Sequence, residues 1–538
     1  MLRLNFYPST YPRYSMDISG VIQDARMNNI PSFLNIKTKA ASDIFFKGLS
    51  NWSSSYTIGQ KRAETVRQLR DKLTTKQMPI LNKAFETISE HESTLRSFWS
   101  EPTEMENEGY SQLLFRGEHT IPLNHIPQLL KVWSVLKIFI FPAMTVSTPL
   151  ITFIAPFIVV KYVMKMPLTF KQYFAIAKKM YLGGGMTSLL GSMNISSPPA
   201  LPSSLGEQAR IWLQTGWVVI SAVQSIMQPI QGAKHTYKLQ NLILEKADAI
   251  RAYMNSFDII RSEFLKVGIK INRVQIPADI FSDNRRLVAF ALENPFIFRM
   301  IDKQIGTYEV WYRFALCPTI TPVQWVYTSN NKPYICFKDI CDIGISIDKQ
   351  RCFNIQLGGE QSQQHALLTG PNRGGKSTAL RAVLRNVLLG HTFGIAIGSA
   401  ATMTTFDWVQ SCLRLEDLPG KASLFEREVA FATASLSRGD TNKGIVFVDE
   451  LFHSTNPPDA AAASSYYLKK LWSQPLIASM ISTHVFELIE NLPAEKPVQQ
   501  LCCPAEIRKD GSVDYKYGLA RGICKVSSVQ EILNEQGL

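Results

Sequence analysis

The sequence lacks the marks of a secreted, disulfide-bonded or zinc-binding chain. All eight cysteines lie between Cys317 and Cys524, and no two form a CxxC pair. A structural zinc site takes four ligands and structural disulfides belong to oxidising compartments, so we expect reduced thiols and no zinc. Residues 1–8 contain no apolar run of the kind that a secretory signal needs. We therefore expect a chain that is not secreted and faces the cytosol, soluble or membrane-associated, with the nucleus as another compartment open to it.

The composition excludes a disordered chain. Apolar residues make up 46% of the 538 residues, which is enough for a globular protein of roughly two to four domains. The net charge of +13 favours contact with nucleic acid or with an acidic membrane surface. A basic soluble protein without a polyanionic partner is the alternative.

Helical periodicity dominates the first half of the chain outside its most apolar part. Apolar residues spaced by three and four, such as Val66 and Leu69, predict a helical N-terminal region over residues 1–130. The same spacing predicts a helical arm or core region over residues 236–330. Residues 101–110 are rich in glutamate and glycine, and we expect a loop there.

Residues 131–235 contain two long runs without a charged side chain. The first run, 138–160, is long enough to span a bilayer, whereas the second, 211–233, is less apolar and contains four glutamines. Three prolines lie seven residues apart in the first run: Pro142, Pro149 and Pro156. The segment between the runs is basic, which argues against two spans beside a cytosolic nucleotide site. Two interpretations stay open: a membrane hairpin, or a buried helical hairpin in a soluble core.

From residue 331 to residue 538 the pattern changes to that of an α/β domain, in which short β-branched runs alternate with glycines and helical stretches. An apolar strand, 365–369, leads directly into a glycine-rich loop and then a helix, the context that a phosphate-binding P-loop requires. The loop and the start of the helix consist of Gly370, Pro371, Asn372, Arg373, Gly374, Gly375, Lys376, Ser377 and Thr378. Glycines let backbone N–H groups turn toward phosphate oxygens. We expect Lys376 to reach the β and γ phosphates of ATP and Ser377 to bind Mg²⁺.

Two further strands end in polar residues that suit the same chemistry. The strand 445–448 ends at Asp449 and Glu450. We expect Asp449 to bind Mg²⁺ directly or through water, and Glu450 to act as the general base toward the attacking water. The strand 476–482 leads to His484, which we expect to reach the γ-phosphate. Buried strands with solvated polar ends are the alternative interpretation.

Residues 350–538 resemble the ATPase domain of the MutS family, within the ABC-type ATPases. The motifs that resemble that domain are the loop with its Pro371-Asn372 pair, the strand end 448–450, the D-loop position 454–459, the switch-histidine segment 482–488 and the signature segment 420–428. Asn354 matches an asparagine that precedes the family's Walker A motif. The resemblance implies ATP and Mg²⁺ as cofactors, and a homodimer in which Ser423 meets the γ-phosphate bound by the partner.

Departures from the family pattern concern the rate of ATP hydrolysis and the recognition of a substrate. The signature and the D-loop are degenerate, and the Q-loop position carries His391 or Thr392 in place of glutamine. No Phe-x-Glu segment occurs near the N-terminus, so the resemblance is to shortened MutS-like proteins without mismatch-recognition domains.

The fold class that follows is α + α/β, with an N-terminal helical core and arm region before a P-loop ATPase domain. The leading hypothesis is a dimeric MutS-like ATPase whose closure on ATP moves helical arms, acting on DNA. One alternative is a membrane-anchored ATPase switch that uses 138–160 and 211–233. Another is an ATP-binding scaffold with little turnover, suggested by the degenerate signature and D-loop.

Overall fold

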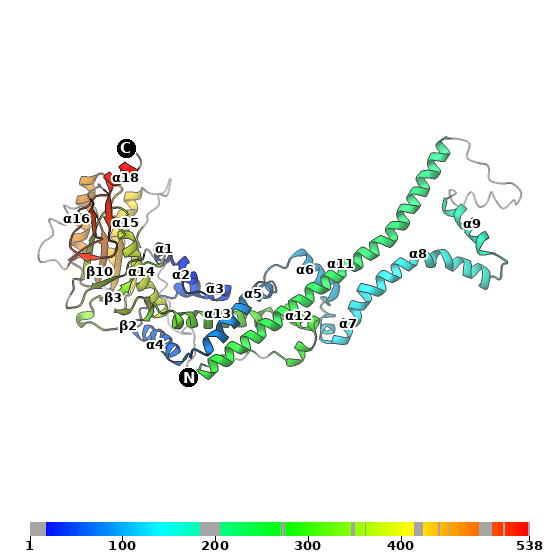
Figure 1. Ribbon diagram of the computed structural model, residues 1–538, viewed down its shortest axis with the longest axis horizontal. Coiled ribbons are helices and arrows are strands. Elements are labelled where there is room, and N and C mark those ends of the chain that lie inside the picture. Colours follow the sequence, from blue (N-terminus) through cyan, green and yellow to red (C-terminus); the bar gives the residue numbers. More distant parts are fainter. Residues whose placement is uncertain are drawn as a thin grey trace. The chain divides into compact units, whose positions relative to one another are not determined.

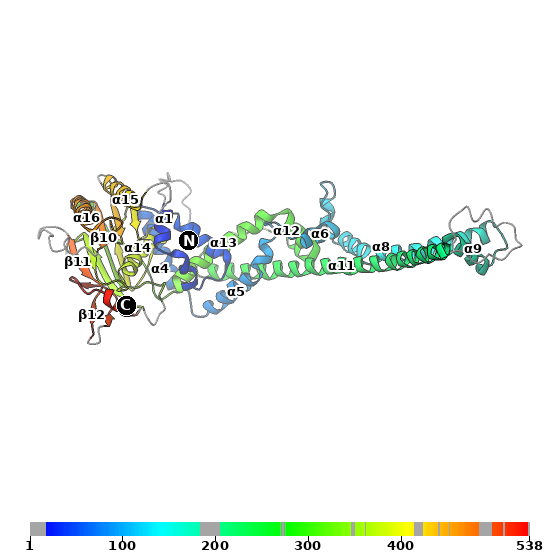
Figure 2. The same ribbon diagram turned by 90° about the horizontal axis from the view of Figure 1, so that it is seen from above.

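A computed structural model of the protein describes residues 18–182, 205–269, 271, 274, 276–345, 350–360, 362–413, 423–439, 442–450, 452–483, 498–508 and 512–535 (Figure 1, Figure 2). The chain divides into two compact units. Unit 1 consists of Met1–Glu90, Ser256–Arg273 and Met300–Leu538, and unit 2 consists of His91–Asn255 and Val274–Arg299. Each unit is therefore assembled from segments that are far apart in the sequence.

Helices make up nearly all of the described chain before residue 320. In order they are α1 (Ser19–Asp24), η1 (Met27–Asn29), α2 (Ile30–Phe33), α3 (Lys39–Leu49), α4 (Tyr56–Lys72), α5 (Gln77–Arg96), α6 (Glu104–Leu113), η2 (Ile121–His125), α7 (Pro127–Val135), η3 (Leu136–Ile140), α8 (Phe141–Ile158), η4 (Val159–Val163), α9 (Phe170–Leu182), α11 (Leu205–Lys266), η5 (Ala278–Ser282), α12 (Asn284–Glu293) and α13 (Pro295–Leu316). The segments η3 and η4 are π-helical. Helices α5, α11 and α13 contribute residues to both units. The helical character expected from the periodicity is thus present.

The loop expected at residues 101–110 is wrong, because α6 begins at Glu104. Its N-terminus has a capping box: the Thr103 hydroxyl accepts a hydrogen bond from the Glu106 N–H (3.3 Å), and the Glu106 carboxylate accepts one from the Thr103 N–H (2.9 Å). The Glu106 carboxylate also forms an ion pair with the buried Lys246 amine at 2.6 Å. Two of the glutamates taken as a sign of a loop, Glu104 and Glu106, are therefore first-turn residues of a helix.

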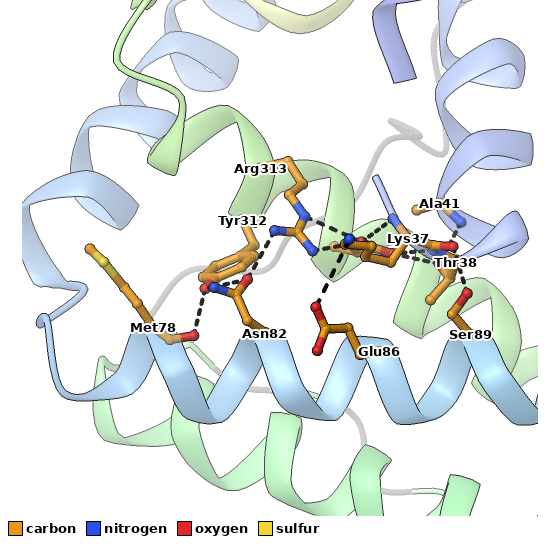
Figure 3. A network of polar contacts seen from close by, with 10 residues as sticks. Lys37, Thr38, Ala41, Met78, Asn82, Glu86, Ser89, Tyr312 and Arg313 are labelled. Carbon is orange, nitrogen blue, oxygen red and sulfur yellow. Dashed lines mark hydrogen bonds and ion pairs between the residues drawn. The ribbon is translucent and has the colours of Figure 1, made fainter. Parts of the chain in front are cut away.

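A buried polar network joins three helices within unit 1 (Figure 3). The carboxylate of Glu309, on α13, accepts hydrogen bonds from the Lys37 N–H (2.7 Å), the Thr38 N–H (3.0 Å) and the Thr38 hydroxyl (2.6 Å) at the start of α3. The Arg313 guanidinium donates to Glu309 (3.2 Å) and to the Asn82 side chain on α5 (2.9 Å). Glu309 is fully buried, so its carboxylate depends on these protein partners in place of water. The network sets the position of α13 against α3 and α5.

The strands all lie in unit 1, after residue 319. They are β1 (Ile320–Pro322), β2 (Gln324–Trp325), β3 (Ile335–Ile340), β4 (Phe353–Leu357), β5 (His365–Thr369), β6 (Ile395–Ile397), β7 (Ala400–Met403), β8 (Trp408–Cys412), β9 (Gly444–Val448), β10 (Ile477–Ser482), β11 (Val498–Cys502), β12 (Ala505–Ile507), β13 (Val513–Tyr515) and β14 (Ala520–Arg521). The described helices among them are η6 (Ser329–Asn331), α14 (Lys376–Phe393), α15 (Leu424–Arg438), α16 (Pro457–Leu471) and α18 (Val529–Glu535). The mixed helix-and-sheet architecture expected from the sequence is present.

The largest sheet has the strand order β14-β11-β5-β10-β9-β8, and all its pairings are parallel except that of the edge strand β14. Strands β5, β9 and β10 are buried along their whole length, as expected for parallel strands covered on both faces. Side chains two residues apart, Val446 and Val448, belong to one apolar cluster with residues of α16 such as Tyr467 and Leu471. Helix α14 contacts β9 and β10. A second sheet has the strand order β2-β7-β3-β4, and none of its strands is paired with a strand of the largest sheet.

The apolar run 138–160 is not buried in unit 2. The exposed fractions of Phe139, Met144 and Ile151 are 61%, 59% and 59%. Of the described helices, Pro127–Pro149 is long and apolar enough to cross a membrane, and only 17% of its most apolar stretch is buried. The interpretation as a buried hairpin in a soluble core is therefore wrong for this run.

Candidate functional site

The candidate site lies where the parallel strands of the largest sheet end. Ser482 at the end of β10 is paired with Leu368 of β5, and Ile481 with Val448 of β9. The residues that follow these three strands therefore emerge at the same edge. In open parallel sheets this edge is where ligands bind.

The loop between β5 and α14 has the backbone shape of an anion-binding nest. Three of its residues have left-handed φ angles: Gly370 (142°), Arg373 (65°) and Gly375 (99°). Alternation of left- and right-handed residues turns successive N–H groups to one side. Helix α14 is 18 residues long, and no side chain caps its N-terminus. Its first N–H groups are thus oriented toward the concave side of the loop, where an anion is favoured.

Two glycines in this loop have no room for a side chain. A Cβ at Gly370 would lie 2.9 Å from the Cys503 carbonyl oxygen, and one at Gly374 would lie 2.9 Å from the Pro371 carbonyl oxygen. The loop is closed by a hydrogen bond from the Gly374 N–H to that same Pro371 oxygen (3.1 Å). Packing therefore requires these glycines independently of any ligand.

Lys376 folds back over the loop that precedes it. Its amine donates to the carbonyl oxygens of Gly370 (3.0 Å) and Pro371 (3.1 Å). Burial lowers the pKa of this amine, while the carboxylates of Glu450 and Asp449 act in the opposite direction. The structure thus brings together the lysine and the two acids that the sequence analysis assigned to one site.

Ser482 organises the acidic side of the site, and the sequence analysis gave it no role. Its hydroxyl donates to the Asp449 carboxylate (2.5 Å) and accepts a hydrogen bond from the Glu450 N–H (3.0 Å). Glu450 itself has a left-handed backbone (φ 54°). One buried hydroxyl therefore aligns the carboxylate of Asp449 and the strained peptide of Glu450. The sequence did contain an indication of this role, because Ser482 is the last residue of the strand that neighbours β9.

The exposed residue Ser423 is the N-cap of α15. Its hydroxyl accepts a hydrogen bond from the Glu426 N–H (3.2 Å), and the Glu426 carboxylate accepts one from the Ser423 N–H (2.8 Å). This capping box holds the pKa of the Glu426 carboxyl below its usual range. The helix start is therefore well defined and open to solvent, as a residue that meets a partner's nucleotide must be.

A second unforeseen contact connects α15 with the segment that follows Glu450. The buried Glu428 carboxylate accepts a hydrogen bond from the Ser454 hydroxyl and lies 3.1 Å from His453 Nδ1. The same Nδ1 lies 2.8 Å from the Glu450 carbonyl oxygen. Both of these partners accept hydrogen bonds, so Nδ1 carries the proton. Any movement of α15 is thereby linked to the backbone at Glu450.

Tyr517 is a further neighbour of the loop that the sequence did not indicate. A Cβ at Gly375 would lie 3.5 Å from the Tyr517 ring, and Tyr517 stacks on Tyr515 with ring centroids 5.9 Å apart. The Tyr515 hydroxyl donates to the Glu531 carboxylate (2.5 Å). Because these residues follow the loop by well over a hundred positions, no local sequence pattern could place them there.

Several expected residues are not joined to the loop by these contacts. Asn354 lies on β4 in the second sheet, where its side chain accepts a hydrogen bond from the Asp339 N–H (2.7 Å). His391 is fully buried at the end of α14 and stacks on Trp52, with ring centroids 3.9 Å apart. The role of Asn354 with a nucleotide stays a prediction, and His391 is a core residue. His484 and the first residues of the signature segment, 420–422, lie outside the described residues.

The residues at this edge fit a magnesium–nucleotide complex. The uncapped helix, the nest and the Lys376 ammonium suit phosphate oxygens. The half-buried Ser377 hydroxyl and the Asp449 carboxylate are hard oxygen ligands of the type that Mg²⁺ takes. Within the described ranges no cluster of three or more His, Cys, Asp or Glu could hold a metal ion. A magnesium ion here would accordingly be held by these two side chains together with the phosphates, which is the arrangement known from P-loop sites.

Comparison with known families gives a match for the C-terminal part of the chain. Residues 366–535 match the family model of MutS domain V, the ATPase domain of MutS proteins. The matched part is less than half of the chain and contains the loop, Asp449, Glu450, Ser482 and α15. This match supports the resemblance to the MutS family drawn from the motifs, for that part of the chain.

Proposed function

We propose that residues 331–538 bind ATP with Mg²⁺ and hydrolyse it at sites that two copies of the chain complete. The observation that carries the proposal is the meeting of Lys376, Asp449 and Glu450 at one sheet edge, beside an uncapped helix N-terminus. A nest, a cation and two acids are the parts that phosphoryl transfer to water requires.

The loop residues bind and orient the triphosphate. Lys376 exchanges its two carbonyl partners for β- and γ-phosphate oxygens, and the first N–H groups of α14 donate to the same anion. Bound Mg²⁺ neutralises negative charge on the phosphates. Ser377 and Asp449 would hold that ion, and the Ser482 hydroxyl keeps Asp449 in place.

Glu450 acts as the general base. Its position directly after Asp449 places its carboxylate on the same side of the sheet edge as the Lys376 amine, whose pKa it influences. It takes a proton from the water that attacks the γ-phosphorus. His484, two residues beyond the end of β10, contacts the γ-phosphate in this scheme.

The second copy supplies Ser423. The exposed, uncovered start of α15 faces solvent, so it is free to approach a γ-phosphate bound by a partner. The hydrogen bonds of Glu428 to Ser454 and His453 then transmit the approach of α15 to the segment after Glu450. Closure of the dimer would in this way complete the site, and the movement of helical arms on ATP binding stays a prediction.

The test compares ATPase activity per protomer across protein concentrations for the wild type, Lys376→Ala and Glu450→Gln. Activity should rise with concentration as dimers form. Lys376→Ala should lose nucleotide binding, and Glu450→Gln should bind ATP while turning over at least about a hundredfold more slowly. The control is Lys443→Ala, because Lys443 is also a buried lysine with a lowered pKa but precedes β9 at the opposite end of the sheet. Full activity in Lys376→Ala would refute the proposal.

We further propose DNA as the substrate, because MutS proteins act on DNA and residues 366–535 match their ATPase domain. Affinity for duplex, branched or single-stranded DNA should fall steeply with salt concentration. No binding to any of these at low salt would exclude DNA. Tight ATP binding without turnover in the wild type would instead favour the scaffold with little turnover.

A further inference from the structure

The positive charge of the chain is concentrated around its apolar helices. Between residues 119 and 206 there is no aspartate or glutamate, and there are seven lysines. Residues 119–244 contain ten lysines and arginines and one acid, Glu207, so this segment has a net charge of +9, and the rest of the chain has only +4. The basic character that could be attributed to nucleic-acid binding is therefore mainly a property of this segment.

Cations bracket the two uncharged runs at identical spacing. Lys137 and Lys161 enclose the run 138–160, and Arg210 and Lys234 enclose the run 211–233. Each run has 23 residues, which in a helix extend about 35 Å, close to the ~30 Å hydrocarbon thickness of a bilayer. A repeated length of this size is not required by packing within unit 2, because most of the described large apolar side chains of both runs are exposed.

The first run is part of one continuous helical stretch, because α7, η3, α8 and η4 follow each other without a break from Pro127 to Val163. Its large apolar side chains face outward. The exposed ones include Phe139, Ile140, Phe141, Met144, Ile151, Ile154, Ile158 and Val159. Such a surface is far more apolar than a water-soluble helix normally presents.

The polar groups inside this run are satisfied without water. It contains four hydroxyl side chains, and each donates to a carbonyl oxygen of its own helix: Thr145 to Phe141, Ser147 to Met144, Thr148 to Met144 and Thr152 to Thr148, at 2.7–2.9 Å. A segment in hydrocarbon must satisfy its polar groups internally, whereas an exposed hydroxyl in water need not.

Lysine and aromatic side chains flank the run at both ends. The Lys137 amine lies 5.1 Å from the Trp133 ring centroid, and the Lys161 amine lies 5.3 Å from that of Tyr162. Aromatic rings with cations above them are enriched where a helix leaves the hydrocarbon and enters the headgroup layer. Beyond this end, Lys165 and Lys171 add to the positive charge next to anionic headgroups.

The second run presents a stripe of exposed apolar side chains along α11. Its members are Leu213, Trp217, Ile220, Val223, Met227 and Ile230, which recur every three or four residues on one side of the helix. The glutamines of this run make it less apolar than the first, so its exposed apolar surface is a stripe on one face of α11.

We propose that residues 133–162 cross an anionic lipid bilayer, and that the stripe on α11 enters the same bilayer. DNA would use the cations but would leave the apolar surface in water. A second copy of the chain would cover apolar surface but would bring two segments of charge +9 together. A bilayer with anionic headgroups satisfies both features at once. Two spans leave the rest of the chain on one side of the bilayer and the basic segment between the runs on the other, which is contrary to the positive-inside tendency if the nucleotide site faces the cytosol. This proposal does not depend on nucleotide binding.

The full-length protein tests it by fractionation. The wild type should sediment with membranes, resist extraction by high salt and alkaline carbonate, and dissolve only with detergent. The double variant Ile151→Asp with Ile154→Asp should move to the soluble fraction, because each carboxylate near the bilayer centre disfavours insertion by about a hundredfold. Both positions are exposed, so the substitutions remove no core contact, and unchanged thermal unfolding of unit 1 would confirm folding. The matched control is Ile259→Asp, an exposed isoleucine of α11 outside both runs, which should leave the protein in the membrane fraction.

Lipid charge is tested by cell-free synthesis with vesicles of phosphatidylcholine alone or with added phosphatidylglycerol. Insertion should favour the anionic vesicles, and the preference should fall by about fivefold for each of Lys161→Gln and Lys165→Gln. Recovery of the wild type in a detergent-free supernatant, as monomer or as soluble oligomer, would overturn the proposal. Release by high salt would also overturn it, since it would indicate attachment by charge alone.

Discussion

The hydroxyl of Ser482 should contribute to catalysis as well as to stability. In Ser482→Ala the charged Asp449 carboxylate loses its hydroxyl donor at 2.5 Å, and the Glu450 N–H loses its acceptor at 3.0 Å. A hydrogen bond to a charged group is worth about 1.5–3 kcal/mol. If this free energy orients the acids in the transition state, kcat should fall by roughly 10- to 100-fold with little change in KM for ATP.

Ser479→Ala provides the matched control. Ser479 lies on the same strand, β10, and is as fully buried as Ser482, but its hydroxyl is bonded to His365 Nδ1 (2.9 Å). Each variant should lower the free energy of unfolding by about 1–2 kcal/mol, since each leaves a buried partner without its hydrogen bond. Only Ser482→Ala should lower kcat.

The assays are steady-state ATP hydrolysis at saturating Mg²⁺ and urea unfolding of the same preparations. An unchanged kcat in Ser482→Ala would refute the reasoning, because Asp449 and Glu450 would then be oriented without the hydroxyl. Equal losses of kcat in the two variants would refute it as well, since the effect would then be one of general stability.

Three further predictions concern the same unit. Gly370→Ala should destabilise the fold by about 1–3 kcal/mol and abolish ATP binding, because the left-handed backbone and the nearby Cys503 carbonyl leave no space for a methyl group. Calorimetry of unfolding would detect the loss of stability, and calorimetric titration with the nucleotide would detect the loss of binding. Burial lowers the pKa of His365 and of His391 to about 3, so the unfolded chain binds more protons below the usual pKa of 6.5 and stability falls as the pH drops. As the pH drops from about 7 to 5, each histidine should lower the free energy of unfolding by about 2 kcal/mol. In His365→Gln, urea unfolding at the two pH values should show a loss of stability that is smaller by the contribution of one histidine. Glu309→Ala should lower the free energy of unfolding by about 3–5 kcal/mol, because it leaves the buried Arg313 guanidinium without its ion-pair partner. The control Glu86→Ala removes an exposed ion pair with Lys37 and should lower the free energy of unfolding by less than about 1 kcal/mol. Similar losses of unfolding temperature in the two variants would contradict the network of Figure 3.

The candidate site was largely predictable because a short stretch of sequence specifies each of its parts. An apolar strand before Gly370 and a helix after Lys376 determine the loop, and an apolar run before Asp449 determines the strand that ends there. Parallel strands align their carboxyl ends, so the meeting of these parts follows from the pattern. The one mistake in local structure, the loop expected at 101–110, arose from composition where the capping box Thr103-x-x-Glu106 indicated a helix.

Other features could not be predicted because they join segments that are distant in the sequence. Tyr517 against Gly375, Glu428 with Ser454 and the Glu309 network each depend on how elements pack. The same holds for His391, which follows the loop in sequence but is enclosed by Trp52 and Phe406 in the core.

The sequence alone determined the pattern of the candidate site and of the apolar region: a glycine-rich loop between a strand and a helix, two acids after a strand, and two uncharged runs with cations at their ends. Local patterns suffice for this, because strand, turn and helix signals act over a few residues. Only the tertiary structure decided which buried hydroxyl aligns the acids, which segments build each unit, and that the run 138–160 is exposed. Whether a residue is buried depends on what packs against it. A buried helix and a membrane-facing helix can be equally apolar, so the sequence alone does not say which of the two the run forms.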